Sequence, residues 1–148
     1  MKKTKFILPY NEKRRLHYHA FRAQQKDQSE VCGVVLVGLD RKIRLQFLPN
    51  LSTSSCSFEV SIRDVNVFKR QVAEQGMRVI GIFHSHIVSE AILGPYDLQE
   101  APLSYMQLIY DICGRQVRMW RIKKITGEKV AIEVPLTVES RSKLRTSH

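Results

Sequence analysis

Apolar residues recur at helical spacing near the start of the chain. Leu16, Ala20 and Ala23 follow one another at four- and three-residue steps, and the opposite face of the segment is basic. This spacing predicts an amphipathic helix over residues 12–25, with Asn11 as its N-cap.

A second helical pattern begins after Ser61. Ser61 and Asp64 resemble a capping box with aspartate in place of glutamate, and apolar residues then recur at helical steps until Gly76. We expect a helix over residues 62–75 that ends at this glycine.

Short apolar or alternating runs predict strands between and after the helices. They cover residues 5–8, 31–37, 43–47, 78–83, 105–112, 116–121 and 125–133, with a brief extended piece at 58–60. The continuous run 31–37 favours a strand buried on both faces, whereas 43–47 alternates and predicts a half-exposed partner in a hairpin. Beyond Pro135 we expect the chain to fray. The order of elements indicates an α+β (α/β) fold, a mixed sheet flanked by helices.

Length and composition indicate an ordinary globular domain. The chain has 148 residues, 43% hydrophobic and 26% charged, which suits one domain with its own core and excludes a disordered chain. No apolar run is long enough to span a bilayer, and no signal peptide is evident, so we expect a cytoplasmic protein without a membrane partner. Cys32, Cys56 and Cys113 lack metal-site spacing, and we expect them to be reduced and buried.

Net charge narrows the choice of partner only in part. The formal charge is +10 and the isoelectric point is about 9.8. A surplus of this size favours an acidic partner, which could be a nucleic acid, an acidic protein surface or a membrane face. The basic clusters lack the interleaved aromatic residues of single-strand readers, so nucleic acid is the weaker candidate.

Candidate metal chemistry lies at the end of the predicted strand 78–83. His84 and His86 are two residues apart, so a strand places both imidazoles on one face and Ser85 on the other. Asp97 follows after ten intervening residues, delivered by a loop or a helix start. Two imidazoles and a carboxylate are the ligand types of a catalytic zinc with an open position for water. The His-x-His pattern alone has little specificity.

The motif gains specificity from Glu30, which stands just before the buried strand. An upstream glutamate, His-x-His, ten residues and an aspartate together resemble the JAMM metallopeptidases, also called MPN+, JAB or Mov34, over roughly residues 5–122. The resemblance implies an MPN/JAB1-like, cytidine-deaminase-like layered fold over residues 1–138, followed by a flexible basic tail, 139–148. It also implies one zinc ion (Zn2+) per chain, held by His84, His86 and Asp97, with Glu30 as the general base.

One position departs from the family pattern. The family has a serine three residues before the aspartate, whose hydroxyl helps to stabilise the oxyanion, and this chain has Gly94 there. Loss of one oxyanion donor costs about 100- to 1000-fold in turnover. Ser89, Tyr96 or the metal alone are the alternatives for that role.

The resemblance implies a peptidase or isopeptidase that cleaves after the C-terminal tail of a ubiquitin-like protein, in deconjugation or precursor processing. Compact stand-alone members are associated with bacterial ubiquitin-like conjugation operons, including anti-phage systems, or with the trimming of sulfur-carrier proteins. A non-catalytic MPN scaffold that binds a ubiquitin-like partner is the alternative, and Gly94 is the residue that favours it. A nucleic-acid-binding module rests on the charge alone.

Overall fold

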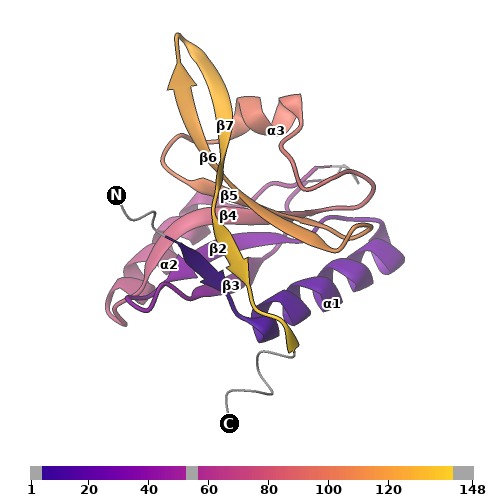
Figure 1. Cartoon of the computed structure of the whole chain (residues 1–148), viewed down its shortest axis with the longest axis horizontal. Coiled ribbons are helices and arrows are strands. Elements are labelled where there is room, and N and C mark those ends of the chain that lie inside the picture. Colours follow the sequence, from indigo (N-terminus) through magenta and orange to yellow (C-terminus); the bar gives the residue numbers. More distant parts are fainter. Residues whose placement is uncertain (1–4, 53–56, 142–148) are drawn as a thin grey trace.

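The computed structural model describes residues 5–52 and 57–141, which form a layered α+β fold (Figure 1). Its helices are α1 (Tyr10–Asp27), α2 (Ile62–Ala73) and α3 (Pro95–Glu100). Its strands are β1 (Phe6–Leu8), β2 (Cys32–Val37), β3 (Ile43–Leu48), β4 (Arg78–His86), β5 (Met106–Asp111), β6 (Gln116–Ile125), β7 (Glu128–Val134) and β8 (Leu136–Val138).

Within the described residues, six strands make one mixed sheet in the order β3-β2-β4-β5-β6-β7. Strands β4 and β5 run parallel, while the other neighbouring pairs are antiparallel. The antiparallel β2–β4 pair brings Cys32 opposite His84. The predicted hairpins β2–β3 and β5–β6 are therefore confirmed, and β4 runs on through both histidines.

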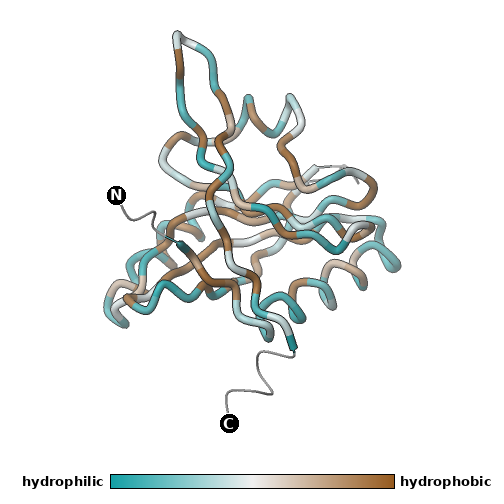
Figure 2. The backbone as a smooth tube through the Cα atoms, viewed as in Figure 1, coloured by the Kyte–Doolittle hydropathy of each residue, from teal (hydrophilic) through white to brown (hydrophobic). Residues whose placement is uncertain are grey.

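The two long helices cover different faces of the sheet. Every residue of β2 is buried, as predicted, and alternate side chains enter different clusters. Val35 packs with Leu16 of α1, whereas Val34 packs with Val65 of α2. The strands of the sheet are mostly hydrophobic, and polar positions follow the outer face of α1 (Figure 2). The chain thus builds an α-β-α layering, as its pattern predicts.

Two expectations at the ends of elements are wrong. Helix α1 starts at Tyr10 rather than after Asn11, because the Pro9 carbonyl accepts hydrogen bonds from the amides of Glu12 and Lys13 at 3.0 and 3.1 Å. The expected extended piece 58–60 belongs to no strand, although the Glu59 carbonyl oxygen accepts a hydrogen bond from the Leu51 amide at 2.8 Å. The chain beyond Pro135 does not fray at once, because β8 pairs in parallel with β1.

Helix α2 confirms its predicted cap. The hydroxyl of Ser61 accepts a hydrogen bond from the Asp64 amide at 3.2 Å, and Gly76 follows the helix with a φ of 74°. That left-handed conformation suits glycine, which has no Cβ to clash with the backbone.

Cysteine placement differs in part from the expectation. Cys32 is buried as predicted, but Cys113 is exposed because it lies in the turn between β5 and β6. Cys56 lies outside the described residues. Across residues 5–52 and 57–141, no helix is long and apolar enough to cross a membrane.

Candidate metal centre

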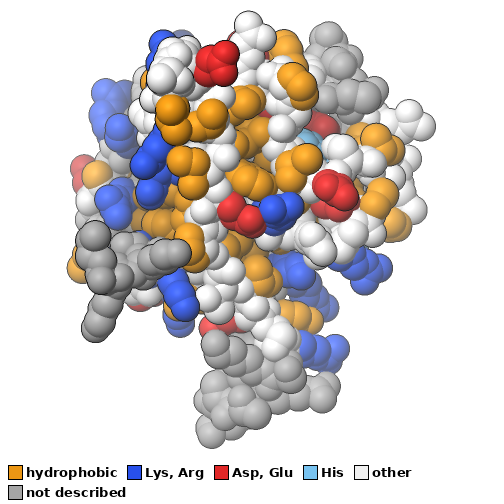
Figure 3. All heavy atoms as spheres, turned by 45° about the horizontal axis from the view of Figure 1, so that its top comes forward, with side chains coloured by type: hydrophobic (Ala, Val, Ile, Leu, Met, Phe, Trp, Pro, Cys, Tyr) orange, Lys and Arg blue, Asp and Glu red, His pale blue; other side chains and the backbone are white. Residues whose placement is uncertain are grey.

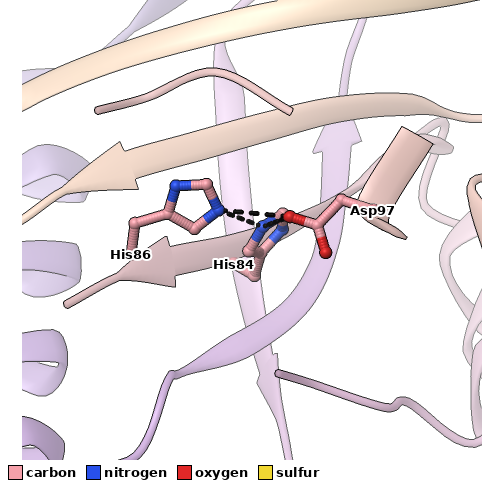
Figure 4. Close-up of side chains that lie close together, drawn as sticks. All are labelled: His84, His86 and Asp97. Atoms are coloured by element: carbon pink, nitrogen blue, oxygen red, sulfur yellow. Dashed lines mark hydrogen bonds and ion pairs between the residues drawn. The ribbon is translucent and has the colours of Figure 1, made fainter. Parts of the chain in front are cut away.

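The two histidines of the motif lie side by side at the end of β4. His84 is fully buried and His86 is 5% exposed. Their Nε2 atoms are 2.9 Å apart, because residues two apart in a strand project from the same face (Figure 4). Ser85 projects to the opposite face, where its hydroxyl accepts a hydrogen bond from the Val31 amide at 2.9 Å.

Asp97 reaches the histidines from the first turn of α3. Its Oδ2 atom lies 3.3 Å from Nε2 of His84 and 3.3 Å from Nε2 of His86. Burial alone would raise the pKa of the Asp97 carboxyl, but the hydrogen bonds from the two imidazoles hold it well below its usual range. Asp97 is therefore a carboxylate at neutral pH.

These three atoms have the spacing of a zinc ligand set. Ligand atoms at about 2.0–2.1 Å from zinc, in tetrahedral directions, lie about 3.3 Å apart. The observed separations are 3.3, 3.3 and 2.9 Å. His84, His86 and Asp97 are also the group of potential ligands that the described residues bring within 4.8 Å of one another. The donor set therefore fits one zinc ion.

Different surroundings act on the two imidazole rings. His86 Nδ1 lies 2.7 Å from the Glu90 carbonyl oxygen, which can only accept, so Nδ1 carries a proton, and the Nε2 proton shared with Asp97 is the one that a metal ion would displace. Complete burial lowers the pKa of His84 and keeps that ring neutral. The ring of Phe58 stacks on His84 with centroids 4.1 Å apart. His84 Nδ1 has no hydrogen-bond partner among the described residues.

Glu30 lies two residues before β2 and belongs to the same site. Its side chain lines a cavity of about 400 Å³ together with His86 and Asp97. Burial raises the pKa of the Glu30 carboxyl to about 7, with the negative charge of Asp97 acting in the same direction and His86 opposing both. The Asn50 side-chain amide donates to the Glu30 carbonyl oxygen at 2.9 Å and fixes the backbone there. A buried carboxyl of this kind exchanges its proton near neutral pH.

A profile of the prokaryotic homologs of the JAB domain matches residues 13–123. The chain belongs to this family. The matched segment contains all four motif residues, Glu30, His84, His86 and Asp97, and ends before β7.

One curated relative of this JAB domain is the desampylase of Pyrococcus furiosus, 30% identical over 70 residues. The match covers 47% of this chain and 50% of the relative, so the chain spans about half the length of the curated relative it matches.

Solved structures share the fold. Protein DSY2949 from Desulfitobacterium hafniense aligns with a TM-score of 0.70 at 22% identity, over 93% of this chain and 96% of that one. AF2198, a JAB1/MPN domain protein from Archaeoglobus fulgidus, aligns with a TM-score of 0.53 at 16% identity, over 89% and 99% of the two chains. The JAB1/MPN-like fold expected from the sequence is confirmed.

Gly94 lies at the rim of the JAB domain's cavity, at the N-cap of α3. Its φ of −70° is ordinary, and an added Cβ would meet no described atom within 4 Å. Neither strain nor crowding therefore requires glycine here. Ser89 and Tyr96, the alternative donors, also line the cavity and are exposed.

Several contacts of the site were missed by sequence reasoning. Three groups outside the motif contact its residues: Phe58 contacts His84, the Glu90 carbonyl contacts His86, and the Asn50 amide contacts Glu30. The only sequence signal was the position of Asn50 at the start of a Ser/Thr-rich stretch. The other two depend on how the chain folds back.

Proposed function

We propose that this JAB domain is a zinc-dependent peptidase or isopeptidase that cleaves after the C-terminal tail of a ubiquitin-like protein. One observation carries the proposal. The Nε2, Nε2 and Oδ2 atoms of His84, His86 and Asp97 converge at zinc-ligand spacing, and Glu30 lines the cavity beside them.

The chemistry divides between the metal and the carboxyl. A zinc ion held by these side chains would lower the pKa of a water molecule toward about 7 and polarise the substrate carbonyl. Glu30 accepts a proton from the attacking water and passes it to the leaving amine. Burial raises the pKa of this carboxyl in the metal-free site, whereas the charge of a bound zinc ion would lower it and keep the carboxylate ready to accept a proton.

The surroundings of the cavity suit an extended segment of substrate, because apolar surface lies beside the acidic residues Glu30, Glu90 and Asp97. Ile87, Val88, Ile92 and Tyr96 contribute apolar surface to it, and a histidine is visible in a hollow bordered by hydrophobic side chains (Figure 3). A second cavity of about 420 Å³ shares Tyr96 and Asp97 with the first. An extended substrate that crosses Asp97 would therefore contact both cavities, with residues on either side of its scissile bond.

Charge is arranged differently at the cavities and over the rest of the chain. The chain has 24 Lys and Arg residues, but among the described residues that line these two cavities none is Lys or Arg. The positive charges behind the net charge of +10 therefore lie outside these two cavities. They would steer a ubiquitin-like partner whose surface is acidic, while apolar and backbone contacts bind its tail.

The desampylase relative and the family membership support a ubiquitin-like substrate over other peptides. The test is cleavage of fusions in which candidate ubiquitin-like proteins, sulfur carriers included, precede a reporter, with mass spectrometry of the products. Cleavage directly after the tail by the zinc-loaded chain, and its loss with a chelator, is expected. Fusions that stay intact with a chain of confirmed zinc content would overturn the proposal.

Gly94 favours a second candidate, a scaffold that binds a ubiquitin-like partner without cleaving it, because an oxyanion donor is missing at that position. Metal analysis separates the two. A chain purified with far less than one zinc per molecule, and unable to bind it on addition, would favour the scaffold.

A further inference from the structure

The hairpin formed by β6 and β7 contacts both chain segments that deliver motif residues to the metal centre. Trp120 of β6 binds the loop after His86, and Lys129 of β7 binds the helix that carries Asp97. The two strands rise beside α3 (Figure 1). Lys129 lies outside the segment that matches the family.

Lys129 fixes the C-terminal end of α3. Its ammonium group donates to the carbonyl oxygens of Gln99 and Ala101 at 2.7 and 2.6 Å. Helix α3 has six residues, none of them buried, and no basic residue in its last turn. So short a helix is not stable by itself, and its last carbonyls lack partners within the helix. Lys129 supplies the missing partners and the positive charge that this end favours.

Trp120 fixes the loop between β4 and α3. Its indole N–H donates to the Ala91 carbonyl oxygen at 2.9 Å. The preceding residue is Glu90, whose carbonyl accepts the proton of His86 Nδ1 and so leaves Nε2 as the nitrogen for a metal ion. The guanidinium group of Arg118 lies 4.7 Å from the centre of the Trp120 ring and also forms an ion pair with Glu133 of β7 at 2.8 Å. Both strands therefore hold the indole in place.

We propose that the β6–β7 hairpin is a positioning element of the metal centre. Lys129 sets the position of Asp97 through α3, and Trp120 sets the orientation of His86 through the Glu90 carbonyl. The inference rests on the proposed zinc site and adds two residues that do not touch the metal. Metal ligands must be held to within about 0.5 Å, and loss of a partner behind a ligand costs about 10- to 100-fold in metal affinity.

The experiment compares the metal affinity of full-length variants by competition with a chromophoric zinc chelator. Lys129→Met should weaken zinc binding by up to about 10-fold, the low end of the range for groups bonded directly to a ligand, because Lys129 acts through the backbone of α3. Lys124→Met is the matched control, because Lys124 is the exposed cross-strand partner of Lys129 and the change removes the same charge from the same hairpin. Its affinity should equal that of the wild type. Lys129→Arg, which keeps donors and charge, should restore most of the loss.

Trp120→Phe is the second variant, since it keeps an aromatic ring under Arg118 and removes the N–H donor together with one ring of the indole. With cobalt in place of zinc, the visible absorption bands report ligand geometry, and we expect them to shift in Trp120→Phe and in Lys129→Met but not in Lys124→Met. Thermal unfolding of the metal-free variants shows whether each one is folded before metal is added.

The outcomes separate the two proposals. If the wild type binds zinc and both Lys129→Met and Trp120→Phe match it in affinity and in cobalt spectrum, the positioning role is wrong and the proposed function stands. If Lys124→Met weakens binding as much as Lys129→Met, charge and not position is the cause, and the positioning role is again wrong. A wild type that binds no metal overturns both.

Discussion

Ser85 and Val31 tie the strand of the histidines to the segment that carries Glu30. The Val31 amide donates to Ser85 Oγ at 2.9 Å, and the Ser85 amide donates to the Val31 carbonyl at 3.0 Å. Val31 is the neighbour of Glu30, and Ser85 lies between His84 and His86. This reciprocal pair therefore fixes the distance between the proposed base and two proposed ligands.

The first prediction concerns Ser85→Ala. Ser85 is fully buried, and the change leaves the Val31 amide without its hydrogen-bond partner. An unpaired donor of this kind lowers the free energy of unfolding by about 1–3 kcal/mol. Urea unfolding of the metal-free protein measures this cost. Ser89→Ala is the control, since Ser89 is exposed, and should change the stability by less than about 0.5 kcal/mol. Equal stabilities of the two variants would contradict the prediction.

The second prediction separates the base from the metal ligands. Glu30→Gln keeps the size of the side chain and removes its ability to accept a proton, so zinc content should remain while cleavage falls at least about 100-fold. Asp97→Ala should lose both zinc and cleavage. Metal analysis and fusion cleavage on the same preparations give the two readouts. Turnover retained in Glu30→Gln would show that another group is the base.

Local patterns predicted most of the elements and one part of the site. Strand periodicity alone places His84 and His86 on one face and Ser85 on the other. The meeting of Glu30 with the histidines depends instead on the antiparallel β2–β4 pairing, which no local pattern encodes. Only the resemblance to a known motif predicted it.

The missed features are contacts between segments far apart in the chain. β8 pairs with β1 across more than a hundred residues, and Lys129 reaches a helix about thirty residues earlier. In the sequence, Lys129 looks like an ordinary polar residue and β8 like part of the C-terminal tail. The error at Asn11 is local in origin, because the Pro9 carbonyl begins the helix and leaves Asn11 inside its first turn.

The third prediction is a loss of stability in mild acid that depends on His17. This ring hydrogen-bonds the hydroxyl of buried Tyr110. Burial lowers the pKa of His17 below its ordinary value of 6.5, and the nearby charges of Arg115 and Lys13 lower it further. The unfolded chain therefore binds a proton at His17 before the folded one does, so this contribution is complete above pH 6.5 and is lost as the pH falls below it.

Urea unfolding of the metal-free protein between about pH 7 and about pH 5 tests this contribution. His17→Gln should lose less stability over that interval than the wild type. A wild-type slope in His17→Gln would assign the acid sensitivity to other groups.

The fourth prediction concerns Gly94→Ser. The cavity rim has room for the side chain, so the substitution should fold without strain. If the hydroxyl takes the oxyanion role that the family pattern assigns to this position, turnover should rise by up to about 100- to 1000-fold with little change in zinc affinity. Gly94→Ala, which adds the carbon without the hydroxyl, is the control and should leave turnover unchanged.

The geometry of α3 gives the same hydroxyl a competing partner. Residue 94 is the N-cap of the helix and Asp97 is its third residue, so a serine hydroxyl there can accept a hydrogen bond from the Asp97 amide. That bond would raise the stability by a few tenths of a kcal/mol, since glycine is already a tolerable cap. A more stable Gly94→Ser variant with unchanged turnover would show that the hydroxyl caps α3 and does not stabilise the oxyanion. The oxyanion would then depend on the metal, Ser89 or Tyr96.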